Sequence, residues 1–266
     1  MRIIMNKKKY IFIIIILLFI LLSYPIRSYL IMSIYSSSSK KESVFVKNDI
    51  NIKIKGGSST LKRDYYPFVM YFNDPIGFSQ FSHVKSDFSI IYNFGSFEFP
   101  FVSSTIFNEN SKYCSTFYGA YAVKPVDDNY AFGFKEGKIN TKEMVLVPKY
   151  DLTVLVLKDL GCKNIQFSYK IQNVKLNNEG FYVIDAILTT NSITHRYNGF
   201  KQNYLQYGRP NIFNKPKDSF GITNYYGKIY AKYLKEKNVT LFYYIITQNK
   251  QTLEETEKKF IQTIKY

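Results

Sequence analysis

The longest apolar run of the chain lies close to the N-terminus. From Ile11 to Leu22 the sequence holds twelve consecutive Ile, Leu and Phe residues. A helix over residues 10–26 would be about 25 Å long, which approaches the ~30 Å hydrocarbon core of a bilayer. A secretory signal would also contain such a run, but no small-x-small cleavage site follows this one closely. We therefore predict a transmembrane anchor at residues 10–26, with a cleaved signal as the alternative.

Charged residues flank this run unequally. Lys7, Lys8 and Lys9 precede it, whereas Arg27 is the first cation after it. Because segments richer in Lys and Arg stay in the cytoplasm, we predict a cytoplasmic N-terminus at residues 1–9 and a domain outside the cytoplasm. Residues 27–43 end in SSSSKKES and are predicted to form a stalk or linker. The expected location is the cell membrane, with a single span, or the exterior if the leader is cleaved.

The domain is expected to occupy residues 44–266, and its first half has the pattern of β-strands. Ile50, Ile52 and Ile54 alternate with polar residues up to a pair of glycines, which predicts a half-buried strand. From residue 65 to 134, short Phe- and Tyr-rich segments are separated by NDP, NFG and KPVDD, which are typical of turns. Gly119, among tyrosines, predicts a close approach of another strand or of a ligand.

The middle of the chain leaves two interpretations open. Asp151 is placed to cap a helix that Gly161 would end, after which residues 165–171 alternate as a strand. The competing interpretation is a strand through LTVLVL at residues 152–157, because short apolar runs do not distinguish the two by periodicity.

The last third predicts paired strands and a final helix. Residues 181–190 are apolar on both faces, which favours a central strand, and residues 228–247 favour a hairpin that turns at 235–238, with a helix for the first arm as the alternative. Thr252 and Glu255 have the spacing of a capping box before a C-terminal helix, one face of which carries Leu253 and Phe260. The predicted fold class is α+β with much antiparallel sheet.

Charge suggests where this domain could bind. The net charge is +16, and seven cations precede the first acidic residue, Glu42, so the domain itself carries +9. Residues 195–238 hold nine Lys and Arg against Asp218 and Glu236, interleaved with ten aromatic residues. Cations with aromatic faces suit an anionic polymer or lipid head group, whereas this excess is too small to favour nucleic acid. The alternative is a solvated basic face whose tyrosines cover the core. The predicted binding residues are Arg196, Lys201, Tyr204, Tyr207 and Arg209.

Few residues suit catalysis or metal binding. Two Cys and two His in no ligand spacing exclude a soft-ligand metal site, and no nucleotide or cofactor motif occurs, so we expect neither metal nor cofactor. Cys114 and Cys162 would form a disulfide outside the cytoplasm, or remain buried thiols. Asp185, among apolar neighbours, is expected to form a structural hydrogen bond or to pair with a cation at a strand edge, with a role as general base as the alternative.

These observations favour a non-enzymatic, membrane-anchored protein that binds an anionic envelope polymer, a lipid head group or a protein partner through its basic and aromatic C-terminal region. Two alternatives remain. One is an envelope hydrolase or transferase that uses dispersed carboxylates and histidines, and the other is a structural subunit of a membrane complex. The enzyme alternative rests on Asp185, Glu98, His83 and His195.

Overall fold

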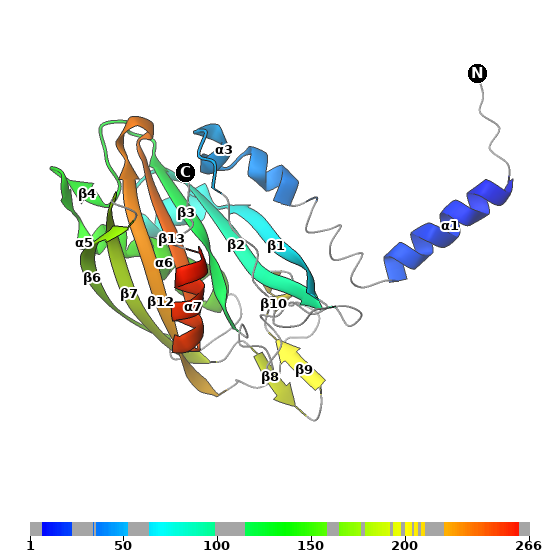
Figure 1. The fold of residues 1–266 in the computed structure, drawn as a ribbon. Helices are drawn as coiled ribbons and strands as arrows, with labels where there is room; N and C mark the ends of the chain where they lie inside the picture. Colours follow the sequence, from blue (N-terminus) through cyan, green and yellow to red (C-terminus); the bar gives the residue numbers. More distant parts are fainter. Residues whose placement is uncertain are drawn as a thin grey trace, which may run out of the picture.

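The computed structural model has the predicted α+β class, with a mostly antiparallel sheet and a C-terminal helix (Figure 1). It describes residues 7–22, 34, 36–52, 64–98, 115–158, 165–176, 179–191, 194–197, 200–203, 205–206, 209–210 and 221–260. The main sheet has seven strands in the order β1-β2-β3-β13-β12-β7-β6, and all neighbours are antiparallel. These strands are β1 (Asp64–Asn73), β2 (Ser86–Glu98), β3 (Phe117–Pro125), β6 (Gln166–Leu176), β7 (Glu179–Asn191), β12 (Ile222–Leu234) and β13 (Val239–Thr247).

Three small hairpins accompany the main sheet. They are β4 (Phe134–Lys135) with β5 (Lys138–Ile139), β8 (Thr194–Tyr197) with β9 (Phe200–Asn203), and β10 (Leu205–Gln206) with β11 (Arg209–Pro210). The helices are α1 (Lys7–Leu22), α3 (Val44–Lys47), α4 (Pro75–Ser82), α5 (Thr141–Met144), α6 (Leu146–Lys149), the π-helix η2 (Tyr150–Lys158), the 3-10 turn η3 (Lys235–Lys237) and α7 (Lys250–Phe260).

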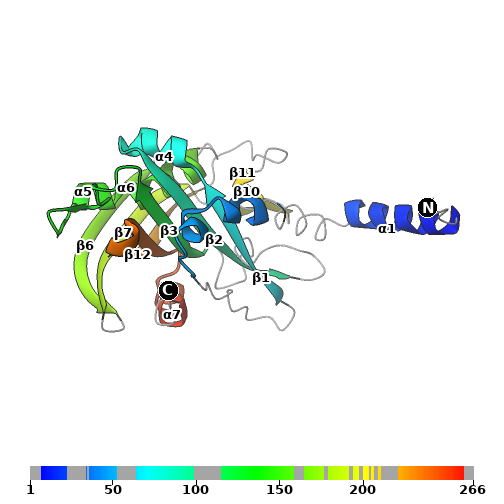
Figure 2. The same cartoon turned by 90° about the horizontal axis from the view of Figure 1, so that it is seen from above.

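Helices cover the main sheet on both sides. One face, which we call the α4 face, is covered by α4, α5, α6 and η2 through residues such as Phe78, Met144 and Leu152. The opposite face, the α7 face, is covered by α3 and α7 through residues such as Phe45 and Leu253. Figure 2 shows α4 and α7 on opposite sides of the strands. The sheet therefore has an apolar core on each side.

The central strands are apolar on both faces, as a doubly covered sheet requires. Every residue of β13 is buried, and successive residues alternate between the two cores. The predicted central strand at residues 181–190 is confirmed as part of β7, which lies between β12 and β6. The predicted hairpin is also confirmed, because β12 and β13 pair directly and Asn238 ends their turn in the left-handed conformation at φ 48°.

Gly119 permits the closest approach within the sheet. A Cβ atom at this position would overlap the backbone carbonyl oxygen of Ile91 on β2. The hydroxyl group of Tyr244, the β13 partner of Gly119, donates a hydrogen bond of 3.1 Å to that same carbonyl oxygen. The tight contact predicted at Gly119 is therefore made with β2 and with the Tyr244 side chain.

Helix α4 begins within the NDP sequence, for which a turn is predicted: Asn73 ends β1, and Pro75 is the first residue of the helix. Asp74 caps it by accepting a hydrogen bond of 3.1 Å from the Gly77 N–H, and Pro75 occupies its first turn. His83 ends the helix in the left-handed conformation. The NDP sequence therefore begins a helix, which the fully buried Phe78 holds on the sheet, whereas NFG at residues 93–95 lies inside β2 and forms no turn.

The first predicted strand is wrong over the residues that the structure describes. Val44 begins a short helix, α3, which Ser43 caps through its side chain, and residues 50–52 belong to no strand. The helix forms because Val44 and Phe45 both reach the α7-face core from one helical turn. Residues 53–63, where the alternation continued, lie outside the described residues.

The C-terminal helix is confirmed, but its predicted cap is wrong. The side-chain oxygen of Asn249 accepts hydrogen bonds from the N–H groups of Gln251 and Thr252, at 2.8 and 3.2 Å. Thr252 is instead buried inside the first turn. Asn and Thr both favour cap positions, so the sequence does not show which of Asn249 and Thr252 is the cap. The two residues differ in burial, which depends on tertiary packing.

The apolar leader forms α1, in which the ten large apolar residues from Tyr10 to Phe19 are all exposed, by 42 to 67%. Across the described ranges, no helix is both long enough and apolar enough to cross a membrane. Residues 23–26 of the predicted span lie outside those ranges.

Replacing Gly119 with Ala should destabilise the domain strongly. The new methyl group meets backbone on β2, which cannot move without breaking the sheet, so the free energy of unfolding should fall by about 3 kcal/mol or more. Gly227→Ala is the matched control, because its Cβ would lie 3.4 Å from the nearest atom and should cost far less. Chemical denaturation of both variants measures the difference, and equal stability losses would contradict the close approach.

Candidate functional site

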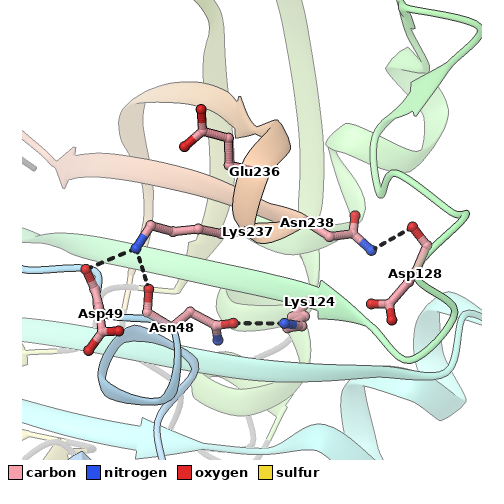
Figure 3. A pocket seen from close by; sticks show the side chains of 7 residues that line it. All are labelled: Asn48, Asp49, Lys124, Asp128, Glu236, Lys237 and Asn238. Carbon is pink, nitrogen blue, oxygen red and sulfur yellow. Dashed lines mark hydrogen bonds between the residues drawn. The ribbon is translucent and has the colours of Figure 1, made fainter.

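A polar hollow lies where the N-terminal segment meets two turns of the domain (Figure 3). We call it the junction hollow, and it has a volume of about 430 Å³. Its walls come from the end of α3, from the end of β3 with the turn after it, and from the β12–β13 turn. The lining residues are Asn48, Asp49, Lys124, Asp128, Glu236, Lys237 and Asn238.

Two lysines in the junction hollow hold the end of α3. The Lys237 ammonium group donates hydrogen bonds to the carbonyl oxygens of Asn48 and Asp49, at 2.6 and 3.2 Å. Lys124 donates one of 2.7 Å to the side-chain oxygen of Asn48. A cation at these carbonyl groups also suits the negative end of the helix dipole. Both ammonium groups therefore already have internal acceptors.

The side-chain amide of Asn238 connects the other two segments that line the junction hollow. The side-chain N–H groups of Asn238 donate to the backbone carbonyl oxygens of Asp127 and Asp128, at 3.4 and 3.3 Å. The carboxylates of Asp49, Asp128 and Glu236 are exposed at its rim and point in different directions in Figure 3. These hydrogen bonds hold the three segments together, so the polar groups of the junction hollow have a structural role.

The residues before α3 are also fastened to the domain. Residues 36–41 are helical, and the backbone N–H of Tyr71 donates to the Ser36 hydroxyl while the Asn73 side chain donates to the carbonyl of Ser39. The Val44 N–H donates to the Ser89 hydroxyl at 2.8 Å. We call residues 36–50 the arm. This attachment cannot be predicted from the sequence, since a run of Ser and Lys is typical of linkers.

A buried carboxylate lies on the α4 face. Asp151, which is 1% exposed, accepts hydrogen bonds from the hydroxyl groups of Tyr92 and Tyr121, the latter at 2.6 Å. Burial raises its pKa to about 6, although the two hydrogen bonds act in the opposite direction. Asp151 lies in η2, directly after α6, so the predicted helix start at this residue is wrong and the helical conformation after it is a π-helix.

Aromatic residues surround this carboxylate. The rings of Tyr121 and Tyr244 are stacked with centroids 4.2 Å apart, and Tyr150 donates a hydrogen bond of 2.5 Å to Asp74. Burial raises the pKa of Tyr92, Tyr121 and Tyr244 well above the usual value. No sequence motif identified this cluster, because its members come from β2, β3, β13 and η2, which only the fold brings together.

The predicted basic and aromatic region divides into two parts. Over β12, its aromatic residues belong to the domain core: Tyr225 and Tyr230 are 2 and 3% exposed. Lys228 forms an ion pair of 2.9 Å with Glu257 on α7, and Lys232 lies over the Phe181 ring. In this part the alternative interpretation, a basic face whose tyrosines cover the core, describes the structure better than a stacking surface does.

The other part contains two of the small hairpins, β8–β9 and β10–β11, and the predicted binding residues. Arg196 on β8 and Lys201 on β9 are register partners, so the backbone places two cationic residues directly opposite each other. Arg209 on β11 is opposite Gln206. Tyr204 and Tyr207 lie outside the described residues. The sequence from residue 186 to 217 contains no Asp or Glu.

The residues of the enzyme alternative are not brought together where the structure describes their side chains. Asp185 on β7 lies on the α7 face, where it accepts a hydrogen bond of 2.9 Å from Gln172. His83 is exposed at the end of α4, across the sheet. Glu98 and His195 have described backbone in β2 and β8, but their side chains lie outside the described set. Asp185 thus has the structural hydrogen bond that was one of its two predicted roles.

Cys114 and Cys162 both lie outside the described residues, so their predicted disulfide stays a prediction. Among the side chains that the structure describes, no group of His, Cys, Asp and Glu could hold a metal ion.

No protein-family model, no curated protein and no solved structure matches this chain.

Replacing Lys237 with Met should loosen the arm. The variant loses two hydrogen bonds from a charged donor, and we expect the free energy that holds residues 44–50 on the domain to fall by about 1–3 kcal/mol. Hydrogen exchange of this segment measures the change. Lys235→Met is the matched control, since its side chain is exposed in the same turn. If both variants exchange alike, Lys237 does not fasten the arm.

Proposed function

We propose that this protein is a non-enzymatic, membrane-anchored protein whose domain binds an anionic ligand, such as an envelope polymer or a lipid head group, through the β8–β11 hairpins. The observation that carries the binding part is the register of β8 and β9, which pairs Arg196 with Lys201. Like charges directly opposite each other in an antiparallel pair repel, and an anion between them removes that repulsion.

The surrounding sequence supports the same site. Residues 186–217 hold five cations and no carboxylate that could neutralise them. The hairpin β4–β5 also pairs two lysines, Lys135 and Lys138. It differs because its turn contains an acidic residue, Glu136, next to this pair. The five cations are Arg196, Lys201, Arg209, Lys215 and Lys217.

The anchor is supported by the surface of α1. Its apolar side chains lie all around the helix and are exposed. Burying them in hydrocarbon would stabilise the membrane-bound state by about 0.8 kcal/mol per CH₂ group. The attachment of the arm adds a constraint on distance. Only residues 23–35 separate α1 from Ser36, and they reach at most about 45 Å when fully extended. The domain therefore stays near the bilayer.

Charges placed within α1 should release the protein from membranes. We expect the full chain to remain with membranes after alkaline extraction, whereas Ile14→Lys with Leu18→Lys should move most of it to the supernatant. Each lysine costs about 2.5–3.5 kcal/mol at the centre of a span. Ile222→Lys is the control, because it places the same charge at an exposed apolar residue of the domain. Retention of the double variant would contradict the anchor.

Neutralising the hairpin cations should weaken polyanion binding. We expect the full chain, in nanodiscs of zwitterionic lipid, to bind long-chain polyphosphate with an affinity that falls steeply as salt rises. The triple variant Arg196→Gln, Lys201→Gln and Arg209→Gln should bind roughly tenfold more weakly and with a flatter salt dependence.

The matched control for this experiment is Lys135→Gln, Lys138→Gln and Lys142→Gln, which removes an exposed cross-strand pair and a third exposed lysine elsewhere. It should bind polyphosphate like the unmodified chain. Repeating the titration with nanodiscs that contain anionic lipid distinguishes the two ligand sources, since lipid held at the hairpins would compete with polyphosphate. Equal losses in both triple variants would contradict a site at the hairpins.

A further inference from the structure

Asp151 is an ionisable group in an apolar core. Its carboxylate is 1% exposed, and both of its oxygen atoms accept hydrogen bonds from tyrosine hydroxyl groups. Within the described part of the chain it forms no ion pair. Burying a carboxylate without a cation costs much free energy when the group is ionised and far less when it is protonated. The stability of the contact between Asp151 and the sheet therefore depends on the charge of this group.

Three strands and η2 place tyrosines near Asp151. Tyr92 comes from β2, Tyr121 from β3 and Tyr244 from β13, and burial raises the pKa of all three well above the usual value. They therefore stay neutral donors between pH 4 and 8. The neighbouring Tyr150 in η2 donates to Asp74, the cap of α4. Burial raises the pKa of Asp151 to about 6, which lies inside that range.

The helix that carries Asp151 is of an uncommon type. A π-helix has wider hydrogen-bond spacing than an α-helix and is seldom stable beyond a single turn, yet η2 extends from Tyr150 to Lys158. Its first three residues are buried, and the side chains of the next three, residues 153–155, are half-buried. Leu152 belongs to the α4-face core, and Val154 and Leu155 pack against it, so Asp151 adds an ionisable group to a largely apolar attachment.

We propose that Asp151 is a pH-sensitive latch, which holds η2 on the sheet while its carboxyl group is protonated and weakens that attachment when the group ionises. In water the carboxyl group titrates near its ordinary pKa of 3.8, and in the folded domain its pKa is about 6. Between these values the closed state binds the additional proton, so opening becomes easier as pH rises. The effect levels off above the folded pKa.

Hydrogen exchange of residues 150–158, measured by mass spectrometry on the full chain in nanodiscs, tests the latch. The rates at each pH are divided by the intrinsic chemical rate of the same peptide. We expect protection to fall roughly 50-fold between pH 4 and pH 7. In Asp151→Asn, which cannot ionise, protection of this segment should vary little with pH.

Two further variants complete the experiment. Asp185→Asn, on the opposite face of the sheet, should keep the full pH dependence. Tyr121→Phe removes a donor that stabilises the ionised carboxylate, so the midpoint of the pH dependence should move upward, and this holds even if Asp151→Asn fails to fold. The proposal is overturned if the unmodified chain shows no pH dependence, if Asp151→Asn keeps it, or if Tyr121→Phe leaves the midpoint unchanged.

Discussion

The structure depends on the burial of both faces of one sheet. The central strands carry apolar side chains in both directions, so neither face can remain in water without a large cost in free energy. The middle of the chain supplies the cover for one face, and segments near its two ends supply the cover for the other. The arm is therefore part of the fold, because Val44 and Phe45 complete the α7-face core.

This requirement explains which polar groups have structural roles. Lys124 and Lys237 hold the end of α3, and Lys228 holds α7 through Glu257, so three cations of the domain stabilise its own cover. A net charge read from the sequence counts these residues together with those on the β8–β11 hairpins. The structure separates the two groups, because Arg196 and Lys201 are register partners in the β8–β9 hairpin and not part of this cover.

The sequence predicted the elements whose signals are local. The β12–β13 hairpin, the strand at 181–190 and the C-terminal helix follow from alternation, turn residues and helical periodicity, and all three are present. Its errors concern residues with a tertiary role. Asp is common at helix starts, which predicts a cap at Asp151, but the carboxylate instead accepts hydrogen bonds from two tyrosines of distant strands. The junction hollow could not be predicted from the sequence either, since its segments are far apart in the chain and meet only in the folded domain.

The order of strands in the sheet also has a consequence for how the chain folds. Strand β3 pairs with β13, and the hydroxyl groups of Thr116 and Thr247, which are hydrogen-bonded to each other, are 131 residues apart in the sequence. Pairings of this separation are slow to form, because a long loop must close before any contact compensates for its entropy. The centre of the sheet cannot assemble until β13 has been synthesised. Until then β1, β2 and β3 lack their central neighbour and expose aromatic strands, so a growing chain would need protection from aggregation.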